Sequence, residues 1–283
     1  MVGTLYVVTT PLGNLQDLTP RAAQTFAEVD FIAAEDTRVT LRLLNHLGLK
    51  KPMISYYEHN ANLRGEGILN RIEAGESCAL CSDAGVPAIS DPGEALVMEA
   101  HQRGIRVVPI PAASAAVTAL CVSGQNTSRF VFEGFLPQNR GQRNTHLDAL
   151  KNETRTMLLY EAPHKLKNTL RDLCGVFGEE HSVTLCRELT KLHEEITKTT
   201  LRALRERFET ENPRGEIVLV LAGAEPANLA EDTPSLESAA EMAAELSVTQ
   251  NIKKGEAARQ IAAQTGHPKS AIYRMMQDQA DTF

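Results

Sequence analysis

Short apolar runs alternate with longer amphipathic stretches along the first 120 residues of the chain. The runs are dominated by apolar residues, which is typical of strands buried on both faces. They lie at Leu5–Val8, Phe31–Ala34, Cys78–Cys81 and Val107–Ile110. Stretches with helical spacing separate them, at 19–28, 37–48, 60–74 and 93–103. This alternation predicts an α/β fold built on a parallel sheet.

The same alternation continues in the second part of the chain. Strand-like runs lie at 130–132, 156–160, 182–185 and 216–220, and helical patterns lie near 139–150, 164–174 and 200–209. The polar stretch Ser123–Ser128 between the two sets has the composition of a linker. We therefore expect two α/β domains, at 1–122 and 123–223.

The remaining residues differ in charge from the rest of the chain. Residues 225–245 hold six Asp or Glu and no Lys or Arg, whereas 251–283 hold five Lys or Arg against three acids. A helical pattern, a Thr-Gly-His turn at 265–267 and a second helical pattern follow the outline of a helix-turn-helix. We expect an acidic connector at 224–250 and a small basic helical module at 251–283.

Several classes of protein are excluded by composition. An apolar fraction of 42% with 23% charged residues indicates a folded chain rather than a disordered or fibrous one. No run reaches the roughly 18 apolar residues of a membrane span, and the N-terminus does not follow the pattern of a signal peptide, so we expect a cytoplasmic protein. The Cys-x-x-Cys at 78–81 lies inside an apparent strand without a second Cys or His pair, so we expect buried thiols and no metal.

Glycine- and proline-rich loops follow four of the predicted strands. Because ligands bind outside the carboxyl ends of parallel strands, and small residues allow the main chain to approach a ligand, these loops predict one shared cleft. These loops lack clustered Lys or Arg. The chain also lacks the G-x-G-x-x-G fingerprint and the phosphate-binding loop. We therefore do not expect the ligand to be bound through phosphate groups. The loops are Thr10–Asn14, Ser82–Gly93, Pro111–Ala115 and Tyr160–Pro163.

The loop at 82–93 is the most specific of the four, and it has two interpretations. It is either a stiffened turn in which Asp83 and Asp91 cap helices, or part of a ligand site. Several other motifs accompany it: Thr-Pro-Leu-Gly-Asn-Leu at 10–15, Ala-Glu-Asp-Thr-Arg at 34–38, Ser-Tyr-Tyr-Glu-His-Asn at 55–60, Glu-Gly-Phe-Leu-Pro at 133–137, Glu-Ala-Pro-His-Lys at 161–165 and Arg-Glu-Leu-Thr-Lys at 187–191.

With these motifs, residues 1–223 resemble the ribosomal RNA small subunit methyltransferase I family of tetrapyrrole-methylase-like enzymes. The resemblance implies two α/β domains with S-adenosylmethionine (SAM) between them, a homodimer, and methylation of a cytidine ribose 2′-hydroxyl in the decoding region of 16S rRNA. The substrate would be that rRNA or the small ribosomal subunit. One departure is Pro111–Ala115, where the family commonly has Pro-Gly-Pro-Ser-Ala.

The resemblance also implies which residues surround the cofactor. Asp83 and the main chain near Ala84 and Val86 would face its ribose and amino-acid end, and Pro11 and Leu12 would face the methyl end. For Leu159 and Ala222 a plain core role is the alternative. The residues expected around the adenine are Ser114, Ala115, Leu159, Tyr160 and Ala222.

Methyl transfer to a ribose hydroxyl needs placement of the oxygen and loss of its proton. We expect Glu161 and Asp36 near that proton, and Arg38 and Arg187 near the hydroxyl or an RNA phosphate. Asp36 has an alternative interpretation as the cap of the helix at 37–48. The sequence does not determine which side chain accepts the hydroxyl proton.

Two windows of the chain are basic enough to contact RNA. Residues 38–71 hold six Lys or Arg against two acids, and 137–171 hold seven against three, although each window also fits a solvated helix face. The net charge of −7 is concentrated in the connector, and without its six acids the chain is nearly neutral. The expected RNA contacts are Arg42, Tyr57, His59, Arg64, Arg140, Arg143 and Lys165.

Two alternatives to rRNA methylation remain at this point. One is a methyltransferase of the same class that acts on a corrin-type ring or a modified histidine. The other is an RNA-binding assembly factor without catalysis.

Overall fold

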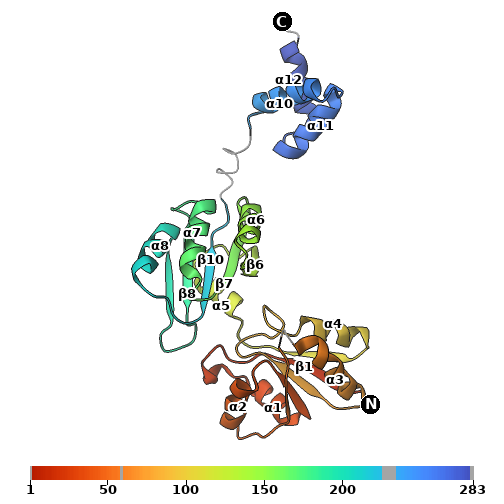
Figure 1. The fold of residues 1–283 in the computed structure, drawn as a ribbon, viewed down its shortest axis with the longest axis vertical. Helices are drawn as coiled ribbons and strands as arrows, with labels where there is room; N and C mark the ends of the chain where they lie inside the picture. The colour runs from red at the N-terminus through yellow and green to blue at the C-terminus, as the bar shows by residue number, and fades with distance from the viewer. Residues whose placement is uncertain (1, 58–59, 225–233, 281–283) are drawn as a thin grey trace. The chain divides into compact units, whose positions relative to one another are not determined.

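A computed structural model describes residues 2–57, 60–224 and 234–280 of the chain (Figure 1). The chain divides into two compact units, Met1–Ala222 and Gly223–Phe283. The first unit contains two five-stranded sheets with helices beside them, which confirms the α/β class.

The first sheet is entirely parallel, in the order β3-β2-β4-β1-β5. The short strand β3 was not predicted, and β5 is an edge strand with Arg106 and Pro109 exposed, so the expectation of burial on both faces was wrong there. An edge position tolerates proline because one side of the strand needs no hydrogen-bond donors. The strands are β1 (Thr4–Val8), β2 (Phe31–Ala34), β3 (Met53–Ser55), β4 (Cys78–Cys81) and β5 (Arg106–Ile110).

Helices cover both faces of the first sheet. α1 (Pro20–Glu28) and α2 (Thr37–His46) pack on one face, and α3 (Ala61–Glu73) and α4 (Glu94–Gln102) pack on the other. Thr19 caps α1 by accepting a hydrogen bond from the Ala22 N–H, with proline at the first helical position. The predicted helices of this part are confirmed within one or two residues at most ends.

The second sheet is mixed, in the order β6-β7-β10-β8-β9. β10 runs antiparallel to both of its neighbours, β7 and β8, so its first residues lie beside the last residues of β7 and β8. β9 was not predicted. The strands are β6 (Phe130–Phe135), β7 (Thr156–Glu161), β8 (Ser182–Arg187), β9 (Glu195–Thr200) and β10 (Ile217–Leu221). The helices are α5 (Ala115–Val122), α6 (Arg140–Leu150), α7 (Leu166–Phe177) and α8 (Leu201–Thr210).

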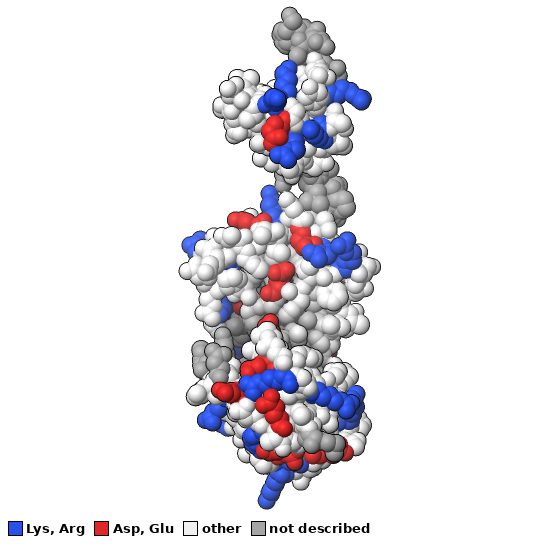
Figure 2. Space-filling model, turned by 90° about the vertical axis from the view of Figure 1, so that its right-hand side faces the viewer, with Lys and Arg blue, Asp and Glu red and all other residues white. Residues whose placement is uncertain are grey.

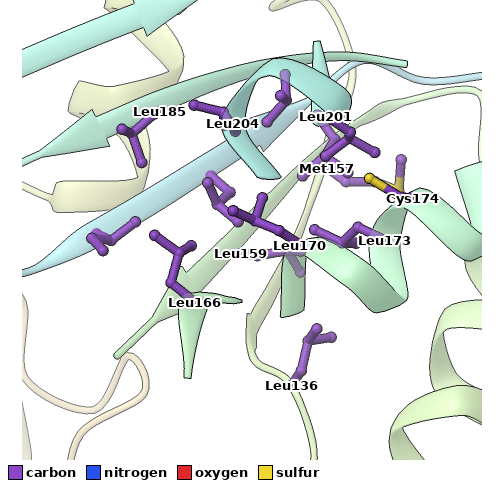
Figure 3. Packing of buried hydrophobic residues seen from close by; sticks show 14 of the residues in the cluster. Leu136, Met157, Leu159, Leu166, Leu170, Leu173, Cys174, Leu185, Leu201 and Leu204 are labelled. Atoms are coloured by element: carbon purple, nitrogen blue, oxygen red, sulfur yellow. The ribbon is translucent and has the colours of Figure 1, made fainter. Parts of the chain in front are cut away.

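The two faces of the second sheet have separate cores. α6, α7 and α8 cover one face, where Leu166, Leu170 and Leu173 of α7 lie near Leu159 of β7 (Figure 3). The other face packs against α5. Since α5 precedes the linker expected at Ser123–Ser128, the chain reaches the second sheet before that segment, and the boundary at 122/123 stays a prediction.

The described residues of the unit Gly223–Phe283 form three helices: α10 (Leu236–Thr249), α11 (Lys254–Thr265) and α12 (Lys269–Ala280). Their core is rich in alanine, which lets helices approach closely, and α10 contributes Ala239, Ala240 and Ala243. The later part of the segment expected as a connector, 236–249, is therefore a helix of this unit, and residues 225–233 lie outside the described ranges. The face of this unit drawn in Figure 2 carries more Lys and Arg than Asp and Glu.

None of the helices within the described ranges combines the length and apolarity needed to cross a membrane. Cys78 and Cys81 are buried free thiols in the cores on opposite faces of the first sheet. Burial raises the pKa of both thiols, that of Cys81 to about 12. Cys121 is also a free thiol but is exposed on α5, because it lies on the face turned away from the sheet.

Candidate functional site

A cavity of about 350 Å³ in the first unit is lined by residues from all four glycine- and proline-rich loops. Parallel strands place the loops that follow them at one edge of a sheet, so the expectation of a shared cleft is confirmed. The loops contribute Leu12, Asp83–Val86, Ile89, Asp91, Ser114, Ala115 and Tyr160–Pro163, and other lining residues are Glu35, Phe135, Cys186, Leu189 and Gly215–Val218.

The first two loops are joined directly by main-chain hydrogen bonds. Thr10 and Gly85 form an isolated antiparallel bridge. The distance from the Thr10 nitrogen to the Gly85 oxygen is 2.9 Å, and that from the Gly85 nitrogen to the Thr10 oxygen is 3.0 Å. The Thr10 hydroxyl also donates to the Ser82 carbonyl at 3.1 Å. Gly85 has a φ of +84°, and a Cβ there would lie 3.1 Å from Cδ2 of Leu12, so this position favours glycine in both conformation and space.

Two acidic loops are tied to each other at the wall of the cavity. The Asp36 N–H donates to Asp83 Oδ1 at 3.1 Å, and the Asp83 N–H donates to Glu35 Oε2 at 3.2 Å. Burial raises the pKa of both Glu35 and Asp83, although these hydrogen bonds oppose the rise. The carboxylates of Glu35 and Asp83 thus face one cavity from two neighbouring strands, β2 and β4.

Asp91 is a residue of the cavity rather than a helix cap. The interpretation in which Asp91 caps a helix is wrong, because α4 begins at Glu94 with Gly93 as its N-cap residue, at a φ of +142°. Burial raises the pKa of Asp91 to about 7, and the nearby negative charge of Glu35 adds to the effect. The structural interpretation of the loop therefore fails for this residue.

The opposite wall is built from the second sheet and α5. The hydroxyl of Tyr160 accepts a hydrogen bond from the Ala116 N–H at 3.1 Å, and its ring makes edge contacts with Phe132 and Phe135. Ser114 occupies the N-cap position of α5, but its side chain makes no capping hydrogen bond. Tyr160 therefore fixes the start of α5 against β7.

A lysine holds two loops together near this wall. Lys191 Nζ lies 2.9 Å from Glu188 Oε1 and 3.2 Å from Glu216 Oε2, and Glu216 lines the cavity. The aliphatic part of Lys191 covers Gly13 so closely that a Cβ on Gly13 would lie 2.6 Å from its Cγ. Glycine at position 13 therefore lets the first loop lie under Lys191.

The structure brings most of the residues expected around the cofactor to this cavity, but not all of them. Leu159 is buried in the core on the other face of the second sheet, because neighbouring residues of a strand point to opposite faces. Ala222 lies beyond the far end of β10, where its N–H donates to the Ser182 carbonyl, and Pro11 does not line the cavity. The expected residues that line it are Leu12, Asp83, Ala84, Val86, Ser114, Ala115 and Tyr160.

The four residues expected in catalysis have different surroundings. Glu161 lines the cavity but is only 5% exposed, and its carboxylate accepts hydrogen bonds from the Ala162 N–H at 2.7 Å and from the Thr169 hydroxyl of α7. Both of its oxygens thus have partners in the fold.

Asp36 and Arg38 form an ion pair beside the cavity. Asp36 caps α2 by accepting a hydrogen bond from the Arg38 N–H, and its Oδ2 lies 2.6 Å from Nη2 of Arg38. The Arg38 guanidinium lowers the pKa of Asp36 to about 2. Arg187, in contrast, does not line the cavity and pairs with Glu195 of β9 at 2.9 Å.

The residues expected to contact RNA fall on two parts of the first unit. Arg42 and Arg64 are exposed on α2 and α3, and Tyr57, between β3 and α3, is 43% exposed. His59 lies outside the described residues.

The second group lies at α6 and α7. Arg140 is exposed at the start of α6, and Lys165 precedes α7. Arg143 is mostly buried and pairs with Asp172 of α7 at 2.7 Å. On the face of Met1–Ala222 drawn in Figure 2, acidic and basic side chains lie side by side.

Three lining residues that carry chemistry or shape were not among the expected site residues: Asp91, Phe135 and Glu216. The repeated Ser-Asp at 82–83 and 90–91 is a signal that pointed to Asp91. Glu216 precedes β10, and only the antiparallel direction of that strand brings it to the cavity. Within the described ranges, no group of three or more His, Cys, Asp or Glu residues is placed to hold a metal ion.

Comparison with known proteins places the chain in a family. Residues 4–205 match the model of the Tetrapyrrole (Corrin/Porphyrin) Methylases. The chain is 46% identical over 276 residues to the ribosomal RNA small subunit methyltransferase I of Synechocystis, covering 97% of both chains. It is 44% identical to the protein of that name from Haemophilus influenzae, covering 97% of this chain and 96% of the relative.

Solved structures of this fold are more distant in sequence. A uroporphyrin-III C-methyltransferase from Thermus thermophilus aligns with a TM-score of 0.55 at 18% identity, covering 78% of this chain and 94% of that one. A cobalt precorrin-4 methyltransferase aligns with a TM-score of 0.60 at 15% identity, covering 77% and 94%. The chain therefore belongs to the tetrapyrrole methylase family, in the branch of the small-subunit ribosomal RNA methyltransferases I.

Proposed function

We propose that the protein uses SAM to methylate a cytidine ribose 2′-hydroxyl in the decoding region of 16S rRNA. The main support is the 46% identity to a ribosomal RNA small subunit methyltransferase I over 97% of both chains. The likeness to ring-modifying methyltransferases, at 15–18% identity, extends to the fold alone. The proposed substrate also implies a cytoplasmic location.

The chemistry of the cavity fits SAM. Of the described residues that line it, every charged one is acidic: Glu35, Asp83, Asp91, Glu161 and Glu216. Such a lining favours a cation, and SAM carries a sulfonium and an ammonium group. The volume of about 350 Å³ lies in the range of small-ligand sites, and Leu12, Val86 and Ile89 supply apolar surface for an adenine.

When bound, SAM would supply an activated methyl group. In that reaction a bond would form from the ribose oxygen to the methyl carbon as the bond from that carbon to sulfur breaks, and the hydroxyl proton would pass to water. Placement of the ribose is therefore the main task of the protein. We assign Arg38 to an RNA phosphate, because its side chain is 86% exposed beside the cavity.

The surroundings of Asp36 and Glu161 limit what each can do for the proton. An acceptor works best when its pKa is near the working pH, and the pKa of Asp36 is lowered to about 2. Glu161 is held by two hydrogen bonds. We therefore propose that Asp36 orients Arg38 and that Glu161 supports the loop that follows β7. Arg187, one residue after the lining residue Cys186, would hold β9 in place through Glu195.

RNA would be held by the exposed surface of α2 and α3 together with the start of α6. Arg42 and Arg64 would neutralise phosphates, and Tyr57 would stack on an unpaired base. The three-helix unit adds further basic residues, among them Lys253 and Lys254.

We also propose a homodimer, formed through α5. All residues of this helix except Thr118 are apolar, and a helix of such composition is normally buried on most sides. One face packs on the second sheet, but Val117 is 55% and Val122 is 44% exposed. A second copy of the chain would cover that face. Light scattering is expected to give twice the chain mass of 30.9 kDa. Val117→Lys should shift the measured mass toward that of one chain. The control Val248→Lys, at an 82% exposed site of α10, should leave the mass unchanged.

The proposed activity is tested with radiolabelled SAM and small subunits from a strain that lacks the enzyme. Label is expected in a cytidine 2′-O-methyl group, identified by mass spectrometry of nucleosides, and absence of label from rRNA ribose would refute the proposal. Asp83→Ala should abolish SAM binding in calorimetry. Arg38→Ala should retain SAM binding and weaken RNA binding.

A further inference from the structure

Asp91 lies in the cavity among carboxylates from separate elements. Glu35 follows β2, Asp83 belongs to the same loop as Asp91, and Glu216 precedes β10. The negative charges of all three act on Asp91. Two hydroxyl groups also interact with Asp91: that of Ser82 lowers its pKa, and that of Tyr160 on β7 senses its charge.

The basic side chains beside the cavity are paired with carboxylates other than Asp91. Arg38 is paired with Asp36 and acts on Asp83, and Lys191 is paired with Glu188 and Glu216. The lining residues themselves include no Lys or Arg within the described part of the chain. Asp91 therefore lacks a protein cation that would offset its charge in the cavity.

The protonation of Asp91 consequently depends on what fills the cavity. Burial in this acidic cavity raises the pKa of Asp91 to about 7, so its protonation changes near neutral pH. A ligand with an additional positive group in the cavity favours the carboxylate, whereas a ligand that lacks this group offsets the burial of the carboxyl less and leaves more of the neutral acid. The protonation of one carboxyl group thus differs between two ligands that differ by one charge.

We propose that Asp91 couples a proton to the charge of the ligand, so that binding of SAM expels the Asp91 proton and binding of S-adenosylhomocysteine (SAH) leaves it in place. The inference rests on the proposed use of SAM. SAM has one more positive charge than SAH, because methyl transfer converts its sulfonium into a neutral sulfide. The surrounding carboxylates therefore attract the methyl donor more strongly than the spent product, and this difference favours exchange of SAH for SAM after each turnover.

Calorimetry of the full chain in two buffers with different ionisation enthalpies measures the proton directly. Proton release on SAM binding should fall from most of a proton at pH 6 to about a tenth of a proton at pH 8, following the linkage between binding and ionisation. The ratio of SAM to SAH affinity should rise by up to about tenfold over the same range. Asp91→Asn should remove both changes, whereas the control Asp148→Asn, at an exposed site on α6, should keep them.

The outcomes separate this inference from the proposed function. If wild-type protein binds SAM but Asp91→Asn releases the same number of protons, Asp91 is not the coupled group and the inference fails. If SAM and SAH release equal numbers of protons from wild-type protein, it fails without any variant. If wild-type protein binds neither ligand, the proposed use of SAM fails instead.

Discussion

The hydrogen bond between Thr169 and Glu161 offers a direct measure of what Glu161 contributes to the fold. Thr169→Val keeps the shape of the side chain but removes the hydroxyl that donates to Glu161 Oε2. The two residues are 2% and 5% exposed, so water does not replace the lost donor. A hydrogen bond to a charged group stabilises a protein by about 1.5–3 kcal/mol, and the substitution should destabilise the first unit by about 2 kcal/mol.

The assay is thermal unfolding followed by circular dichroism. For a unit of roughly 220 residues, about 2 kcal/mol lowers Tm by about 4–8 °C. Thr145→Val is the matched control, because Thr145 is an exposed helical threonine whose hydroxyl donates to a carbonyl of its own helix; its Tm should change by about 1 °C or less.

Glu161→Gln distinguishes support of the fold from chemistry. The amide retains an acceptor for the Ala162 N–H and the ability to bond the Thr169 hydroxyl, so its Tm should fall less than that of Thr169→Val. A Tm for Thr169→Val within about 1 °C of wild type would refute the structural role. Loss of methyl transfer by Glu161→Gln at unchanged Tm and SAM affinity would show that the carboxylate takes part in the reaction.

Three further predictions concern the cavity and the core. Gly85→Ala should weaken SAM binding and lower Tm, because the residue has a φ of +84° and its Cβ would meet Leu12. The control Gly67→Ala, at an open helical site in α3, should instead raise stability by about 0.5–1 kcal/mol. Equal effects of the two substitutions would contradict the geometry. Asp91→Asn should raise Tm at pH 8 but have little effect at pH 4. The pKa of Asp91 is raised to about 7 from a usual value of 3.8, so ionisation of its carboxyl group in the fold lowers stability increasingly from pH 4 to pH 7. A gain in Tm that is constant with pH would contradict this reasoning. Leu170→Ala, at a fully buried site, should destabilise the first unit by about 2–5 kcal/mol in denaturant unfolding, and a loss below about 1 kcal/mol would contradict the packing.

Elements that carry their own local signals could be predicted from the sequence. Thr19 with a following proline begins α1, and Gly48 adopts a φ of +68° just after α2, as the helix-stop pattern predicts. The strands that were missed lack such signals. β3 has only three residues, and β9, at the edge of its sheet, has Ile196 as its only apolar residue, so neither strand contains a long apolar run.

The candidate site was predictable where it depends on loops and less so where it depends on topology. The four loops predicted the cavity, because parallel strands bring together their carboxyl ends and the loops that follow them. Ala222, at the end of the last strand, was expected there from the family resemblance, but β10 runs antiparallel to β7. Its first residues, from Glu216, therefore reach the cavity, and the direction of a strand depends on pairing between distant segments.

The bridge between Thr10 and Gly85 has a consequence for amide hydrogen exchange. Each of the two amides is protected only while the other residue's carbonyl stays in place, so both should exchange through a single opening event and at similar rates. Two loops that follow different strands of the first sheet would then open and close as one body, and filling of the cavity would slow both amides together.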